Sequence, residues 1–143
     1  MKNNILVIGL GYVGLPLAIN LSKYFKVIGF DKSIKRINEL KKGKDCNEEV
    51  SKNEILKSKI KFFFDEKELN SKIDTFIITV PTPVNAKKKP DIRNLISACK
   101  LISKKIKKNN LIIIESTIAP GTTEDVCLDL ISKKSKVNRR DLN

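Results

Sequence analysis

The stretch Ile5-Leu6-Val7-Ile8-Gly9-Leu10-Gly11-Tyr12-Val13-Gly14, followed by Asp31 at the end of the next apolar run, decides the fold of this chain. Its first four residues predict a buried strand, and the spaced glycines predict a turn that leads into a helix. Gly9 allows the tight turn, and Gly11 lets the backbone approach a pyrophosphate without a Cβ atom in the way. Gly14 lets the helix pack closely against the sheet.

This spacing of glycines and acid predicts a dinucleotide site. The start of the helix offers unpaired N–H groups and a partial positive charge to phosphates. Asp31 follows Gly11 by 20 residues, the separation at which a carboxylate meets the ribose 2′-hydroxyl. Because that carboxylate repels a 2′-phosphate, the sequence favours NAD over NADP. The alternatives are a tight turn in another α/β protein and a secretory signal, but three glycines and Pro16 interrupt the apolar run that a signal needs.

The charge of the chain is strongly positive, but it does not indicate a specific nucleic-acid partner. The net charge is +13, yet lysine, isoleucine and asparagine account for 58 of the 143 residues, and only four residues are arginine. Arginine is the usual side chain for reading bases and phosphates, and aromatic platforms are scarce at 6% of residues. We therefore expect the lysines to be spread over exposed faces, and the length of 143 residues predicts a single domain. No apolar run reaches ~18 residues, so no membrane-spanning segment is predicted.

The cysteines and the lack of histidine narrow the chemistry. Cys46, Cys99 and Cys127 lie far apart, are odd in number and form no C-x-x-C motif, so neither a disulfide framework nor a zinc site is predicted. Cys99 falls on the apolar face of a predicted helix and is expected in the core. The sequence holds no histidine, which excludes a histidine general base and a histidine–metal site.

Apolar periodicity along the chain predicts alternating strands and helices. Strands are expected over residues 4–8, 26–30, 61–64, 75–80 and 111–115. Helices are expected over residues 12–23, between Ser33 and Gly43, within 45–59, at 66–69, between Asp91 and Asn109, and over 122–131, with an exposed loop at 85–90. Ser33 and Asp91 are the expected N-caps of the second and the fifth of these helices. Right-handed crossovers arrange them as an α/β fold with a doubly wound parallel sheet of order 3-2-1-4-5, the Rossmann architecture. This domain is expected to span residues 1–131 and to precede a frayed basic tail at 132–143.

The ligand crevice of such a sheet lies at the carboxyl ends of its strands. The loops that face it resemble those of the nucleotide-sugar 6-dehydrogenase family, which includes UDP-glucose, GDP-mannose and UDP-N-acetylhexosamine dehydrogenases. The residues that carry the resemblance are Gly9 to Pro16, Asp31 with Arg36, Val80 to Val84, Pro90-Asp91, Glu115 to Thr117 and Pro120 to Glu124. Together with Glu49-Val50, the last two loops are most similar to the UDP-N-acetylhexosamine branch.

The resemblance implies which residues bind NAD. These residues are Gly9, Gly11, Tyr12, Val13, Gly14, Asp31, Arg36, Val80, Thr82 and Thr117. Arg36 is expected to lie over the adenine or to pair with Asp31, and the alternative is a solvated helix residue. Thr82 stands between two prolines that stiffen its backbone, and the alternative is a simple strand-ending turn. Thr117 is also implied to help position the catalytic water.

The reaction that the resemblance implies is the NAD-dependent oxidation of a UDP-sugar C6 alcohol to a uronic acid. This reaction would take place in the cytoplasm and supply precursors of surface polysaccharide. It needs a cysteine nucleophile, a lysine and an aspartate that belong to later parts of the family's chains, and none of the three cysteines here matches that nucleophile. We therefore expect the chain to bind NAD without turnover and to meet the UDP-sugar only through a missing C-terminal half.

Two consequences concern assembly. The sixth strand of the sheet is expected to be missing, which would leave residues 111–114 as an open edge that favours self-association. The full-length enzyme is implied to be a homo-oligomer. The alternative to an oxidoreductase fragment is a non-catalytic NAD-binding or regulatory module.

Overall fold

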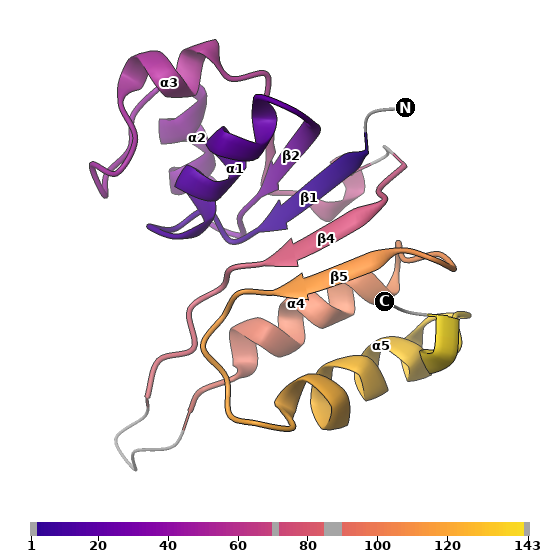
Figure 1. Ribbon diagram of the computed structural model, residues 1–143. Coiled ribbons are helices and arrows are strands. Elements are labelled where there is room, and N and C mark those ends of the chain that lie inside the picture. Colours follow the sequence, from indigo (N-terminus) through magenta and orange to yellow (C-terminus); the bar gives the residue numbers. More distant parts are fainter. Residues whose placement is uncertain (1–2, 70–71, 85–89, 142–143) are drawn as a thin grey trace.

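Figure 1 shows the computed structural model, which describes residues 3–69, 72–84 and 90–141. Among them, five strands form one parallel sheet of order β3-β2-β1-β4-β5, as the sequence predicts. The strands are β1 (Asn4–Ile8), β2 (Lys26–Phe30), β3 (Lys61–Phe63), β4 (Thr75–Ile78) and β5 (Leu111–Ile114). The strand order reverses between β1 and β4, which places a crevice at their carboxyl ends.

Helices cover both faces of this sheet (Figure 1). The helices are α1 (Gly14–Ser22), α2 (Ile34–Lys41), α3 (Lys52–Lys57), α4 (Arg93–Ser103) and α5 (Asp129–Lys134), with short turns η1 (Glu66–Glu68), η2 (Thr123–Leu128) and η3 (Arg139–Asp141). α1, α2 and α3 lie on one face, and α4 and α5 lie on the other. The predicted cap of α2 is confirmed, because the Ser33 hydroxyl accepts a hydrogen bond from Arg36 N at 3.2 Å.

Several elements begin or end away from the predicted residue. β4 ends at Ile78 rather than at Val80, because its neighbour β1 turns away at Gly9. α1 begins at Gly14 rather than at residue 12. α4 has Ile92 at its N-cap position instead of Asp91, whose carboxylate accepts a hydrogen bond from Arg93 N. The last helix begins as the π-helical turn η2 and becomes α-helical only in α5.

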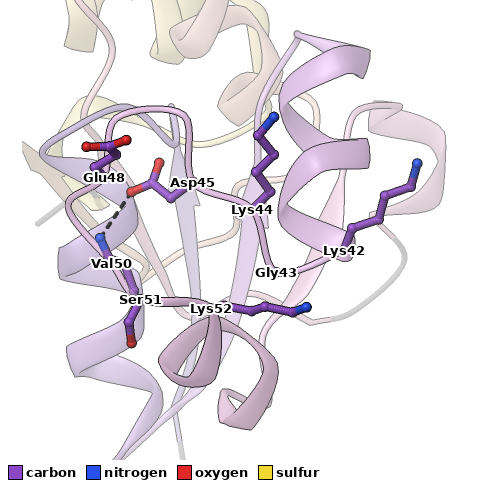
Figure 2. Close-up of a pocket in the computed structure, with 8 residues that line it drawn as sticks. All are labelled: Lys42, Gly43, Lys44, Asp45, Glu48, Val50, Ser51 and Lys52. Atoms are coloured by element: carbon purple, nitrogen blue, oxygen red, sulfur yellow. Dashed lines mark hydrogen bonds between the residues drawn. The ribbon is translucent and has the colours of Figure 1, made fainter.

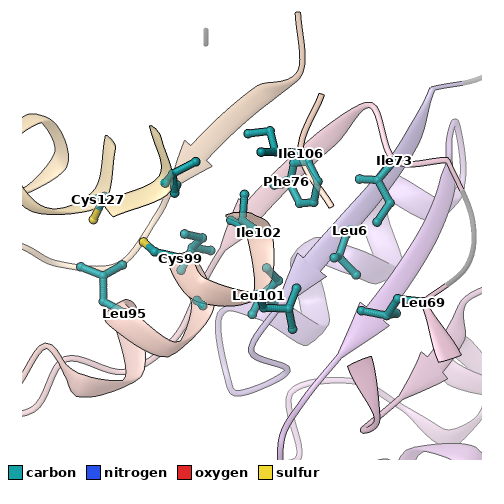
Figure 3. Packing of buried hydrophobic residues seen from close by; sticks show 14 of the residues in the cluster. Leu6, Leu69, Ile73, Phe76, Leu95, Cys99, Leu101, Ile102, Ile106 and Cys127 are labelled. Carbon is teal, nitrogen blue, oxygen red and sulfur yellow. The ribbon is translucent and has the colours of Figure 1, made fainter. Parts of the chain in front are cut away.

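The core consists of two apolar clusters, one on each face of the sheet. Leu6 and Ile8 of β1 point into the cluster beneath α4 and α5, and Ile5 and Val7 point into the cluster beneath α1 and α2. This burial on both faces explains why the strands are continuously apolar. Figure 3 shows the first cluster, in which Cys99 lies beside Cys127, so the predicted core position of Cys99 is confirmed.

The carboxyl-terminal residues contact the body of the domain through Val137, which packs against the cluster beneath α4 and α5, and through Asp141. α5 runs on to Lys134, and the turn η3 follows it. Asn109 N donates a hydrogen bond to Asp141 O at 3.1 Å, and Lys108 Nζ lies 3.0 Å from Asp141 Oδ1. The boundary expected at residue 131 stays a prediction, and most of the loop expected at 85–90 lies outside the described residues.

One edge of the sheet is formed by β5, whose one strand neighbour among the described residues is β4. Leu111 at its start is 40% exposed, and the other three residues are half-buried. The self-association expected of this edge stays a prediction. In the described parts of the chain, no helix combines the length and the apolar character needed to cross a membrane.

Candidate functional site

The glycine turn after β1 forms the floor of the crevice. Gly9 has a φ of +96°, which confirms its role in the tight turn, and its N–H donates to Phe30 O of β2 at 2.8 Å. A Cβ atom on Gly14 would lie 1.9 Å from Gly9 O, so the start of α1 rests directly on the turn. A Cβ atom on Gly11 would meet no atom within 4 Å. The space beside Gly11 is therefore open to a ligand, as the predicted approach of a pyrophosphate requires.

Two side chains hold the peptide groups of Leu10 in the middle of this turn. Asp31 Oδ2 accepts a hydrogen bond from Leu10 N at 2.9 Å, and Asp31 Oδ1 accepts one from Ser33 N at 2.9 Å. Arg36 Nε donates to Leu10 O at 2.8 Å. Asp31 and Arg36 therefore both contact the glycine turn, although Asp31 directly follows β2 and Arg36 lies in α2. Each Asp31 oxygen keeps a free lone pair for a ribose hydroxyl.

Arg36 is neither paired with Asp31 nor solvated, so the structure corrects both of these readings. The residue is 7% exposed, and its Nη1 lies 2.7 Å from Asp45 Oδ1 in a buried ion pair. Nη1 also donates to Cys46 Sγ at 3.2 Å, whereas buried Nη2 has no hydrogen-bond partner among the described residues. The predicted contact between Arg36 and the adenine stays a prediction.

Asp45 organises the connection between α2 and α3 as well as the arginine. Its carboxylate accepts hydrogen bonds from the backbone N–H groups of Asn47, Glu49 and Val50. Burial alone would raise the pKa of this carboxyl, but the hydrogen bonds and the charge of Arg36 outweigh it and lower the pKa. The connection also borders an open hollow of about 590 Å³, lined by Lys42, Asp45, Glu48 and Ser51 among others (Figure 2). That hollow contains none of the predicted cofactor residues.

Two cavities flank the Gly11–Asp31 edge of the crevice and share these two residues. The first has a volume of about 510 Å³. Its lining includes Gly9, Phe30, Asp31, Val80, Asn94, Ser97 and Ala98. The second has a volume of about 320 Å³ and includes Leu10, Ser33, Arg36 and Cys46. The open space beside Gly11 thus adjoins both cavities, an arrangement that fits a bound dinucleotide.

The loops after β4 and β5 are fastened to each other. Thr82 Oγ1 donates to Thr117 O at 2.5 Å, and Ser116 Oγ donates to Val80 O at 2.7 Å. The structure therefore brings the two predicted threonines together. Tyr12 and Val13 are 68% and 44% exposed and line neither of the two cavities. Their predicted contacts with NAD, like those of the threonines, stay predictions.

The sequence analysis missed three residues at this site. Lys32 Nζ donates to Asn94 Oδ1 at 2.6 Å, and Asn94 Nδ2 donates to Pro81 O at 3.1 Å, so α4 is joined to the ends of β2 and β4. The third is Thr79, whose hydroxyl contacts the glycine turn. For Lys32 and Asn94 the available signal is their position just after the predicted strand 26–30 and near the start of the predicted helix that follows Asp91. Thr79 lies inside the strand predicted at 75–80, so the sequence offers no signal for its hydroxyl. Within the described ranges, no three His, Cys, Asp or Glu side chains gather to hold a metal ion.

Comparisons with known proteins agree with this geometry. The sequence profile of the UDP-glucose/GDP-mannose dehydrogenase family, NAD binding domain, matches residues 3–143. The chain is 41% identical over 131 residues to UDP-N-acetyl-D-glucosamine 6-dehydrogenase of Salmonella typhi, covering 92% of this chain and 31% of that protein. It is 44% identical over 140 residues to UDP-N-acetyl-D-mannosamine dehydrogenase of Methanococcus vannielii, and this match covers 91% of this chain and 32% of that protein.

Solved structures show the same relationship. The structure of UDP-D-ManNAc dehydrogenase from Pyrococcus horikoshii superimposes with a TM-score of 0.87 at 32% identity, covering 97% of this chain and 34% of that one. GDP-mannose dehydrogenase from Pseudomonas aeruginosa gives a TM-score of 0.86 at 26% identity, covering 97% and 34%. The chain spans about a third of the length of these relatives. It belongs to the UDP-glucose/GDP-mannose dehydrogenase family and corresponds to the NAD binding domain of that family.

Proposed function

We propose that this chain supplies the NAD site of a UDP-N-acetylhexosamine 6-dehydrogenase. The observation that carries the proposal is the open crevice along Gly11 and Asp31, in a chain whose relatives include UDP-N-acetyl-D-glucosamine and UDP-N-acetyl-D-mannosamine dehydrogenases. The sugar, the cytoplasmic location and the homo-oligomer are parts of the same proposal. They rest on the resemblance of the chain to whole enzymes three times its length.

In this proposal each part of the crevice has one task. Gly11 and the start of α1 receive the pyrophosphate, because the backbone there is open and carries a partial positive charge. Asp31 accepts hydrogen bonds from the adenosine ribose and disfavours a 2′-phosphate. Bound NAD supplies the hydride acceptor for the oxidation of the sugar alcohol. Thr82 and Thr117 lie where the loops after β4 and β5 meet, and Thr117 helps to position the water of the second oxidation.

The test is calorimetric titration of the 143-residue chain with NAD and with NADP. We expect NAD to bind more tightly than NADP. Asp31→Ala should weaken the binding of NAD and reduce the difference in affinity between NAD and NADP. Asp74→Ala is the matched control, because Asp74 Oδ2 also accepts a backbone hydrogen bond, from Asn4 N at 3.0 Å, but at the amino end of the sheet. Equal affinity of the unmodified chain for both cofactors would contradict the role of Asp31.

Turnover separates the oxidoreductase from a non-catalytic NAD-binding module. Because the nucleophile of the family belongs to a later part of its chains than these 143 residues match, these residues alone should form no NADH from NAD and UDP-N-acetylglucosamine. Fusion to the C-terminal two thirds of the Salmonella relative should restore NADH formation. If the fused protein binds both ligands and still produces none, the non-catalytic module is the better description.

A further inference from the structure

Thr79, the residue that follows β4, contacts the backbone of the glycine turn. Its Oγ1 lies 2.6 Å from Gly9 O and 3.1 Å from Ile8 O. The side chain is buried, and its hydroxyl is the hydrogen-bond donor to Gly9 O among the described residues. Thr79 N also donates to Ile8 O at 2.9 Å. The end of β4 is thus joined to the turn that follows β1, at the point where the strand order reverses.

The carbonyl that Thr79 contacts also lies against Gly14, the first residue of helix α1. A Cβ atom on Gly14 would lie 1.9 Å from Gly9 O and 2.4 Å from Thr79 Oγ1. The turn, the start of the helix and the threonine hydroxyl therefore meet at one point without spare volume. The position of Gly9 O fixes where the N–H groups at the start of α1 point, and these groups face the phosphates of a dinucleotide.

The next peptide groups of the turn are held by other side chains. Asp31 accepts from Leu10 N, and Arg36 donates to Leu10 O. Neither of them contacts Gly9 O, so the carbonyl that touches the helix depends on Thr79. A turn that is held before the ligand arrives loses less conformational freedom on binding, and this difference appears as affinity.

We propose that Thr79 is a positioning residue of the NAD site, because its hydroxyl holds the Gly9 carbonyl in the orientation that the bound cofactor needs. The inference rests on the proposed role of the turn in binding the pyrophosphate. Thr79 does not line either cavity beside Gly11, so it acts through the backbone of the turn rather than by contact with NAD.

The test compares Thr79→Ser with Thr79→Ala, because the two variants differ only in the hydroxyl group. The matched control is Thr75→Ser against Thr75→Ala, since Thr75 is the first residue of the strand that Thr79 follows, is also 8% exposed and lies at the opposite end of the sheet. We expect the NAD Kd of the alanine variant to exceed that of the serine variant about tenfold at position 79 and to be unchanged at position 75, with Kd measured by calorimetry on folded protein.

A merely structural role would lower the unfolding temperature of the alanine variants without separating their NAD affinities. Equal NAD affinity of Thr79→Ser and Thr79→Ala, in a parent chain that binds NAD, would overturn this inference alone. A parent chain that does not bind NAD would overturn the proposed function, and this inference with it. If Thr79→Ala fails to fold, Thr79→Cys replaces it: the thiol is a weak donor, and serine-like affinity in that variant would also overturn the inference.

Discussion

Replacing Gly14 with alanine tests whether the third glycine of the turn is needed for folding rather than for the ligand. The new Cβ atom would lie 1.9 Å from Gly9 O and 2.4 Å from Thr79 Oγ1, although real Cβ contacts essentially never fall below 3.0 Å. Either α1 or the turn must then shift by about 1 Å in a closely packed region. A shift of Gly9 O is costly, because Gly9 N donates a hydrogen bond to β2 and Gly9 O accepts one from Thr79.

We expect Gly14→Ala to lower the free energy of unfolding by about 3 kcal/mol, at the upper end of the cost of overpacking. For a domain of this size, that loss lowers the unfolding temperature by roughly 10 °C. The measurement is thermal and urea unfolding followed by circular dichroism. An unfolding temperature within about 2 °C of the parent would refute the argument from close contact.

Gly11→Ala is the matched variant, because its Cβ atom meets nothing within 4 Å and its backbone does not require glycine. The unfolding free energy should stay within about 0.5 kcal/mol of the parent. The same Cβ atom enters the space assigned to the pyrophosphate, so the NAD Kd should rise at least about tenfold. A Gly11→Ala variant that unfolds as early as Gly14→Ala would contradict the division of roles between the two glycines.

Three other variants or measurements address the rest of the domain. Asp45→Asn should lower the unfolding free energy at pH 7 by about 3 kcal/mol, because it leaves the buried Arg36 charge unpaired. Folding lowers the pKa of Asp45, so the parent keeps its full excess of unfolding free energy over Asp45→Asn above the unfolded pKa of 3.8 and loses it as the pH falls further. The unfolding free energies of the two proteins, measured in urea, should therefore converge in acid, and a difference that stays constant with pH would contradict this explanation. Ser51→Ala should cost about 1 kcal/mol in the same assay, because it removes the capping box of α3. Exposed Cys46 should react quickly with a thiol reagent in the native protein and the two buried cysteines only after unfolding, whereas three fast thiols would contradict the described core.

Much of the fold could be predicted because its signals are local. Each apolar run, in β1, β2, β4 and β5, consists of neighbouring residues, and so does the glycine turn between β1 and α1. The handedness of the crossovers then fixes the strand order. The π-helical turn η2 carries no local signal that separates it from an α-helix, so the sequence predicts one continuous helix there. The position where β4 ends depends on where the neighbouring strand β1 turns away, and the sequence of β4 itself does not contain this information.

The site was harder to predict because its contacts join distant residues. Arg36 could be placed near Asp31 from spacing, but its partner Asp45 follows from the path of the α2–α3 connection. Thr79 belongs to an apolar run, where a β-branched residue is expected for packing, so nothing in the pattern marks its hydroxyl. The bond between Lys32 and Asn94 spans 62 residues and depends on the packing of α4.

Arg36 also has a thermodynamic consequence. One guanidinium group contacts the cofactor turn through Leu10 O and the α2–α3 connection through Asp45, so the two segments share an interaction. A ligand that tightens the turn should therefore stabilise the connection, and a partner that binds the connection should change cofactor affinity by the same factor, since coupling between two binding events is reciprocal. We therefore expect binding at the outer surface of residues 45–50 to alter the cofactor affinity of the dinucleotide crevice.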